Sequence, residues 1–173
     1  MNFDQLKTES QLLLGKSLAS LTEVEMMINT AITHYYLGES SSQKYDNFLQ
    51  DLMQEGKIGL DQKRELINKV IKRERPEDAK LLSEKLMRKY IKLRNIIAHS
   101  TLMVLVKDDE NFTLNDAILF NSAQKKYNLV KTAEEVTEVV RQMHDAIDGS
   151  FMMEIVTEDG YDGSEGYLYA LSD

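Results

Sequence analysis

Hydrophobic residues recur at helical spacing through most of the first hundred positions of the chain. From about Asp4 to Leu37 they fall at alternating intervals of four and three residues, which places one apolar stripe along a helix. The stripe consists of Leu14, Leu18, Leu21, Ile28, Ile32 and Tyr35. Between Leu21 and Ile28 the series lands on Glu25, so the pattern predicts a long first helix with a carboxylate on its buried side.

Three more helices follow before position 100. The pattern predicts them over Gln43–Gln54, Leu60–Arg73 and Pro76–His99. A Gly follows the first of these segments, and Pro76 opens the last, where Pro is tolerated in a first helical turn.

The pattern after His99 changes to short β-prone segments. Residues 102–106 and 112–114 predict a small β-hairpin, which 117–120 and 127–130 extend. A last helix is expected from Thr132, because Thr132 and Glu135 form a capping-box pattern. The expected fold is mainly α: one domain over residues 1–150 with four to five helices and a small β-hairpin. Residues 151–173 form an acidic C-terminal extension, expected to be partly flexible.

Composition narrows the functional classes. The 173 residues include no Cys, which excludes disulfides, thiolate metal sites and Cys nucleophiles. No apolar run approaches the roughly 20 residues that a membrane span needs, and the first ten residues do not resemble a leader, so a cytoplasmic protein is expected. The net charge of -8 argues against a broad nucleic-acid-binding surface but permits a narrow basic cleft. Basic residues concentrate between Lys57 and Arg94, whereas 154–173 has no Lys or Arg.

One compact polar motif closes the predicted fourth helix. Its sequence is Arg94-Asn95-Ile-Ile-Ala-His99. It resembles the signature of the HEPN superfamily, an Arg followed after four to six residues by His, often with Asn directly after the Arg. The segment from Leu21 to Tyr36 also looks like the first helix of many bacterial members. The helix order agrees as well, so the resemblance covers roughly residues 10–149 and implies an up-and-down helical bundle.

The resemblance implies a metal-independent endoribonuclease that needs no cofactor. The catalytic residues would be Arg94, Asn95 and His99. His99 suits proton transfer near neutral pH, Arg94 suits phosphate binding, and Asn95 suits hydrogen bonding to either. Relatives commonly act as homodimers on RNA in defence, toxin–antitoxin or stress responses, so an antitoxin or other partner protein is a further expectation, and a membrane is not.

Helix geometry constrains this site. At about 100° per residue, Arg94 and His99 lie roughly 140° apart around the axis, whereas Asn95 and His99 share a face. One wound helix is therefore a poor complete site, and two copies meeting across a two-fold axis would build a better one. Glu25 is the supporting residue, because a buried carboxylate needs a partner and Arg94 is the candidate.

Other interpretations stay open. Arg94 and His99 could simply stabilise a helix C-terminus. The alternative function is a non-catalytic HEPN module that binds RNA, a nucleotide or a partner protein; a third is a purely structural partner. Thr101 stands where some relatives carry a Tyr that a nucleotidyltransferase modifies, which argues against membership of that toxin–antitoxin subset.

Overall fold

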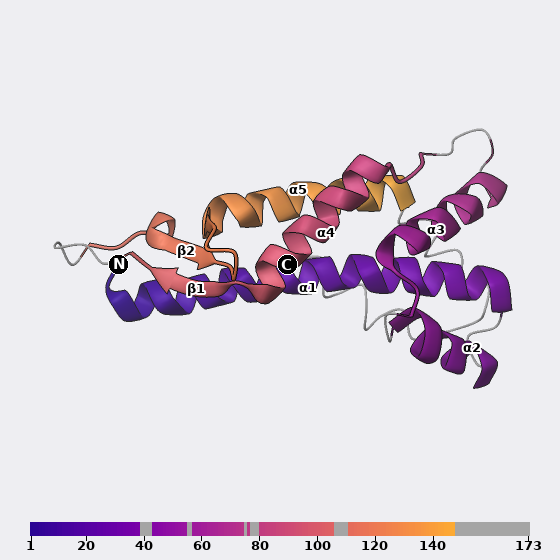
Figure 1. The fold of residues 1–173 in the computed structure, drawn as a ribbon, viewed down its shortest axis with the longest axis horizontal. Coiled ribbons are helices and arrows are strands. Elements are labelled where there is room, and N and C mark those ends of the chain that lie inside the picture. Colours follow the sequence, from indigo (N-terminus) through magenta and orange to yellow (C-terminus); the bar gives the residue numbers. More distant parts are fainter. Residues whose placement is uncertain (39–42, 55–56, 75, 77–79, 106–110, 148–173) are drawn as a thin grey trace. The chain divides into compact units, whose positions relative to one another are not determined.

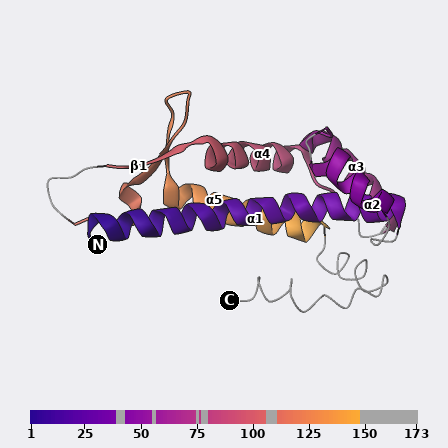
Figure 2. The same ribbon diagram turned by 90° about the horizontal axis from the view of Figure 1, so that it is seen from below.

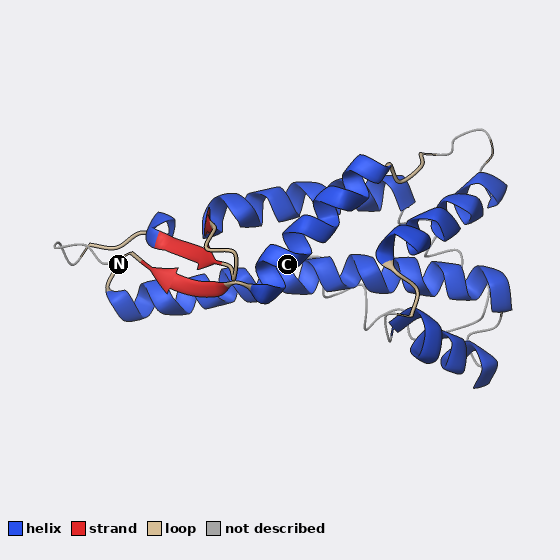
Figure 3. Cartoon of the chain, viewed as in Figure 1, coloured by secondary structure: helices blue, strands red, loops and turns tan. Residues whose placement is uncertain are grey.

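The fold is mainly helical with one small sheet (Figures 1 and 3). A computed structural model describes residues 1–38, 43–54, 57–74, 76, 80–105 and 111–147. The helices are α1 (Phe3–Leu37), α2 (Gln43–Phe48), its π-helical continuation η1 (Leu49–Gln54), α3 (Leu60–Glu74), α4 (Glu84–His99) and α5 (Leu129–Ile147). The predicted mainly-α class is confirmed, whereas the HEPN arrangement stays a prediction.

The chain forms two compact units. Of the described residues, those in 1–25 and 83–143 form unit 1, and those in 26–82 and 144–147 form unit 2. The expected extension over 151–173 lies outside the described residues. No helix among those residues combines the length and apolarity that a membrane span needs.

The buried stripe of α1 is rotated relative to the predicted one. Leu21 and Ile28 are buried as expected, but Leu18 is 41% exposed and Val24 is fully buried. The stripe therefore passes through Val24, and Glu25 lies on its edge with a side chain that is 21% exposed. The prediction that Glu25 occupies a core position was therefore wrong, since its neighbour Val24 occupies that position. The error arose because α1 has apolar residues on more than one side, so the pattern alone allows two stripes.

α4 begins later than predicted because a side chain of α3 binds the main chain just before it. The Asn68 side chain of α3 donates to the carbonyl of Leu82 at 2.9 Å and accepts from the Leu82 N–H at 2.8 Å. This pair holds the chain before α4 in a non-helical conformation. Ser83 then caps the helix, with its hydroxyl oxygen accepting from the Leu86 N–H at 3.1 Å. A helix starting at Pro76 was therefore a wrong prediction.

The sheet in unit 1 has three antiparallel strands in the order β1-β2-β3. These are β1 (Thr101–Val104), β2 (Ala117–Phe120) and β3 (Lys126–Asn128). The predicted strand at 112–114 is absent, because Leu114–Asp116 forms a 3₁₀ turn, η2. The expected hairpin is thus extended to three strands, with β2 as the central one.

The start of α5 also differs from the prediction. The helix begins at Leu129, where the Asn128 side chain accepts from the Lys131 N–H at 3.0 Å. Thr132 lies inside the helix, and its hydroxyl donates to the Asn128 carbonyl at 2.8 Å. The capping box of Thr132 and Glu135 was therefore wrong. The predicted inner face is confirmed at Val136, Val139, Met143 and Ile147, which are buried, whereas the predicted Val140 is only partly buried.

The rotated stripe of α1 gives a direct test. We expect Leu21→Ala to lower the free energy of unfolding by about 2–5 kcal/mol, because Leu21 is 1% exposed and its loss leaves a cavity. Leu18→Ala removes the same atoms from an exposed site and should cost less than about 1 kcal/mol. Urea unfolding of both variants measures the difference, and equal losses would contradict the register of α1.

Candidate functional site

The sequence-predicted residues Arg94, Asn95 and His99 all lie in the last two turns of α4. The helix stays wound through His99, and the Ser100 N–H closes it by donating to the carbonyl of Ile96 at 3.1 Å. β1 begins directly after this cap. The angular separation expected from an intact helix therefore holds, and Arg94 and His99 point to different sides.

Arg94 faces α1, as predicted. Its Nε lies 3.3 Å from Oε2 of Glu25, and the two side chains are 40% and 21% exposed. Both residues belong to unit 1, in which the end of α4 that leads into β1 lies next to α1 (Figures 1 and 2). The predicted ion pair is present. It holds the guanidinium at the boundary between core and solvent, and it leaves the two Nη groups as donors.

Tyr90 makes a second contact between α4 and α1 beside the Glu25–Arg94 pair, and the sequence did not predict this role. Its side chain is fully buried, and its hydroxyl donates to the carbonyl of Leu21 at 2.6 Å. Burial, and then the nearby Glu25 carboxylate, raise the pKa of Tyr90 far above its usual value, although Arg94 opposes the shift. Tyr90 lies one turn before Arg94, and Leu21 one turn before Glu25. The same i, i+4 spacing on the two helices allows both contacts to form together.

Asn95 and His99 face solvent. Both side chains are exposed, and neither has a hydrogen-bond partner among the described residues. They lie roughly 40° apart around the helix axis, so a single ligand atom can approach both. One chain therefore presents two separate pieces of the predicted site: Arg94 beside α1, and an exposed amide and imidazole on the outer face of α4.

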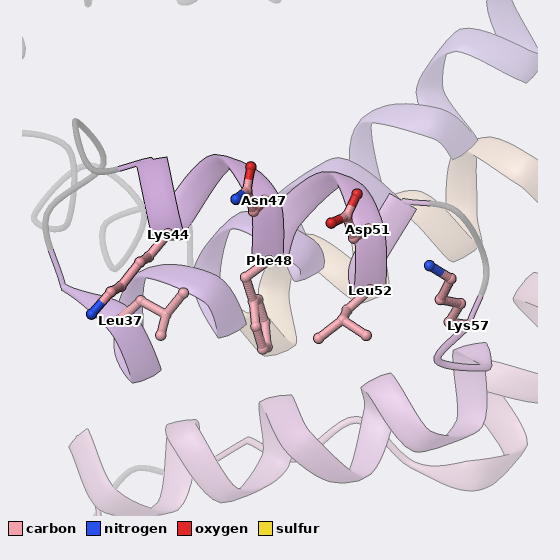
Figure 4. A pocket seen from close by; sticks show the side chains of 7 residues that line it. All are labelled: Leu37, Lys44, Asn47, Phe48, Asp51, Leu52 and Lys57. Carbon is pink, nitrogen blue, oxygen red and sulfur yellow. The ribbon is translucent and has the colours of Figure 1, made fainter.

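A groove in unit 2 contains none of these residues. It has a volume of about 550 Å³ and is lined by Leu37, Lys44, Asn47, Phe48, Asp51, Leu52 and Lys57. Figure 4 shows Phe48 and Leu52 side by side on the groove-facing side of the α2–η1 segment. The groove is open and is lined by three apolar and four polar or charged side chains, and it brings together no set of residues suited to acid–base chemistry. The cluster on α4 therefore remains the better candidate for a reaction.

Comparison with protein-family models, with curated proteins and with solved structures gives no match for this chain. Within the described parts of the chain, no three His, Asp or Glu side chains form a group that could hold a metal ion.

The raised pKa of Tyr90 predicts a loss of stability in alkaline solution. A pKa that is higher in the folded than in the unfolded state adds stability that is complete below the unfolded value, about 10.0, and is lost as the pH rises above it. We expect Tyr90→Phe to flatten this alkaline decline. Unfolding free energies between about pH 8 and about pH 11 measure it. The control is Tyr36→Phe, which alters an exposed ring; a slope changed as much by Tyr36→Phe as by Tyr90→Phe would contradict the assignment.

Proposed function

We propose that this protein is a HEPN-type, metal-independent endoribonuclease whose active site is shared between two copies of the chain. The observation that carries the proposal is the arrangement around Arg94. A cation that is tethered to Glu25, yet two-fifths exposed, is held in a fixed direction while it stays accessible to a phosphate. The long first helix, the motif helix and the exposed His99 support the same assignment.

The chemistry follows from the residue types. His99 would take the proton from an RNA 2′-hydroxyl, whose oxygen then attacks the adjacent phosphorus. The bond from phosphorus to the 5′-oxygen breaks, and the leaving oxygen takes up a proton to give a 5′-hydroxyl. The other product is a 2′,3′-cyclic phosphate. Arg94 would stabilise the charge that accumulates on the non-bridging oxygens, and Asn95 would hydrogen-bond the same phosphate.

The shared site follows from the separation of these groups on α4. Arg94 and His99 lie roughly 140° apart on a wound helix, so they do not converge on one phosphate. A two-fold axis beside α4 would place Arg94 of one copy opposite Asn95 and His99 of the other, and would create two equivalent sites. The proposed biological setting, defence, toxicity or stress response with a neutralising partner, rests on the resemblance alone.

The second candidate function is a HEPN module that binds RNA, a nucleotide or a partner protein without cleaving it. One observation favours it: among the described residues nothing orients the imidazole of His99, whereas a catalytic base is usually held by a hydrogen bond. In a dimer, a residue of the second copy could supply the hydrogen bond that orients the His99 imidazole.

The proposed chemistry predicts RNA cleavage that persists in EDTA and depends on His99. We expect His99→Gln to lower the cleavage rate by a factor on the order of 10² or more, because general acid–base catalysis contributes that much. His144→Gln is the matched control, since it replaces another helical His. Single-turnover cleavage of a mixed RNA pool gives the rates, and circular dichroism verifies folding. A folded wild-type protein without activity would overturn the proposal in favour of the binding module.

The shared site predicts that two inactive variants restore each other. Arg94→Gln and His99→Gln should each be inactive alone, but a mixed dimer contains one site with both residues intact. After unfolding and refolding together, an equal mixture should regain about a quarter of wild-type activity, because half of the dimers are mixed and each has one intact site of two. Activity that stays at the level of the separate variants would place Arg94 and His99 in the same site of one chain.

A further inference from the structure

The charge of α4 is opposite to that of the whole protein. The chain has a net charge of -8, yet α4 contains five Lys or Arg residues and a single Glu, a net charge of +4. Among the described helices, α4 therefore has the highest net positive charge, and it contains the candidate site residues.

Three of these cations are aligned with Asn95 and His99. Lys85, Arg88, Lys92, Asn95 and His99 follow one another at intervals of three, four, three and four residues, and all five are exposed. At about 100° per residue they fall within an arc of roughly 80° on the face turned away from Arg94. We call Lys85, Arg88 and Lys92 the α4 cation row. From Lys85 to His99 the line extends about 21 Å along the helix, at roughly one residue per turn.

Acidic neighbours neutralise little of this row. Glu84 pairs with Arg88 one turn away, but both side chains are more than half exposed, and such pairs are weak. Glu138 of α5 lies close enough to Lys89 to interact with it, but Lys89 is outside the row. Lys85 and Lys92 have no ion-pair partner among the described residues. The row is thus open to an external anion.

We infer that the α4 cation row binds the phosphates of single-stranded RNA and leads the strand to His99. Evenly spaced cations on one helix face match a flexible polyanion that extends along the axis, and the row ends at the side chains proposed to act on a phosphate. The inference rests on the proposed function for the choice of RNA, but binding along the row does not require cleavage. Binding of this kind releases counterions, so its affinity falls with salt in proportion to the number of contacts.

The test compares two double variants with equal changes of charge. Lys85→Glu with Lys92→Glu alters the row, whereas Lys7→Glu with Lys131→Glu alters exposed lysines on α1 and α5. The probe is a short fluorescent 2′-O-methyl RNA, which lacks the attacking hydroxyl and is not cleaved. Anisotropy titrations at several salt concentrations give affinity and salt slope, and thermal unfolding verifies that both variants fold.

We expect the row variant to bind at least about tenfold more weakly than the wild type and to lose about 1.4 from its salt slope, which corresponds to two phosphate contacts with a single strand. The control variant should keep most of the slope. Equal weakening by both variants would overturn the row as the binding surface, and equal binding of duplex DNA would overturn the assignment to single strands. If binding depends on the row but no RNA is cleaved, this inference stands and the proposed nuclease activity is rejected. If cleavage depends on His99 but not on the row, the nuclease activity stands and this inference is rejected.

Discussion

The orientation of α4 in unit 1 depends on the buried hydroxyl of Tyr90. Apolar burial of Met87, Leu93 and Ile97 attaches the helix, at about 1.5–3 kcal/mol for each large side chain, but burial alone tolerates some rotation about the axis. A phenol hydroxyl without water must have a hydrogen-bond partner, and the Leu21 carbonyl is the acceptor. That requirement fixes the rotation, and two further features follow from it. Arg94 reaches Glu25 one turn on, and the opposite arc of α4 remains in solvent with His99 and the cation row.

The elements of the fold that depend on local pattern could be predicted from the sequence. The length of α1, the inner face of α5 and the helical character of 84–99 all follow from apolar periodicity. The errors arose where two local signals competed and a tertiary contact decided between them. Pro76 is a good first residue of a helix, but Asn68 binds the main chain at Leu82 and delays the helix until Ser83 can cap it. Asn128 and Thr132 are both suitable N-cap residues. Because β3 ends at Asn128, the helix can begin directly after it, and the Asn128 side chain is the one that caps it.

Some features of the candidate site could likewise be predicted from the sequence, and others could not. The Glu25–Arg94 pair was predictable, because a carboxylate next to an apolar stripe requires a cation, and Arg94 lies on the apolar arc of its own helix. The divergence of Arg94 and His99 was predictable too, since it depends only on the helix staying wound. The role of Tyr90 was not, because nothing in a sequence distinguishes a tyrosine that packs from one whose hydroxyl binds a neighbouring helix. The cation row was present in the spacing, but exposure of its members had to come from the structure.

The acidity of the protein and a cationic row on α4 are compatible, because electrostatic forces in salt solution are short-ranged. At physiological ionic strength charges are screened beyond about 8 Å, so a phosphate in contact with Lys85 or Lys92 responds to them far more than to distant carboxylates. Those carboxylates still matter for selectivity, since they repel a polyanion from the rest of the surface. A net negative protein whose most positive helix is α4 would therefore direct phosphate binding to that helix. For an enzyme acting at His99, this confinement would favour productive contacts over non-specific ones, although it would lower the overall affinity for nucleic acid.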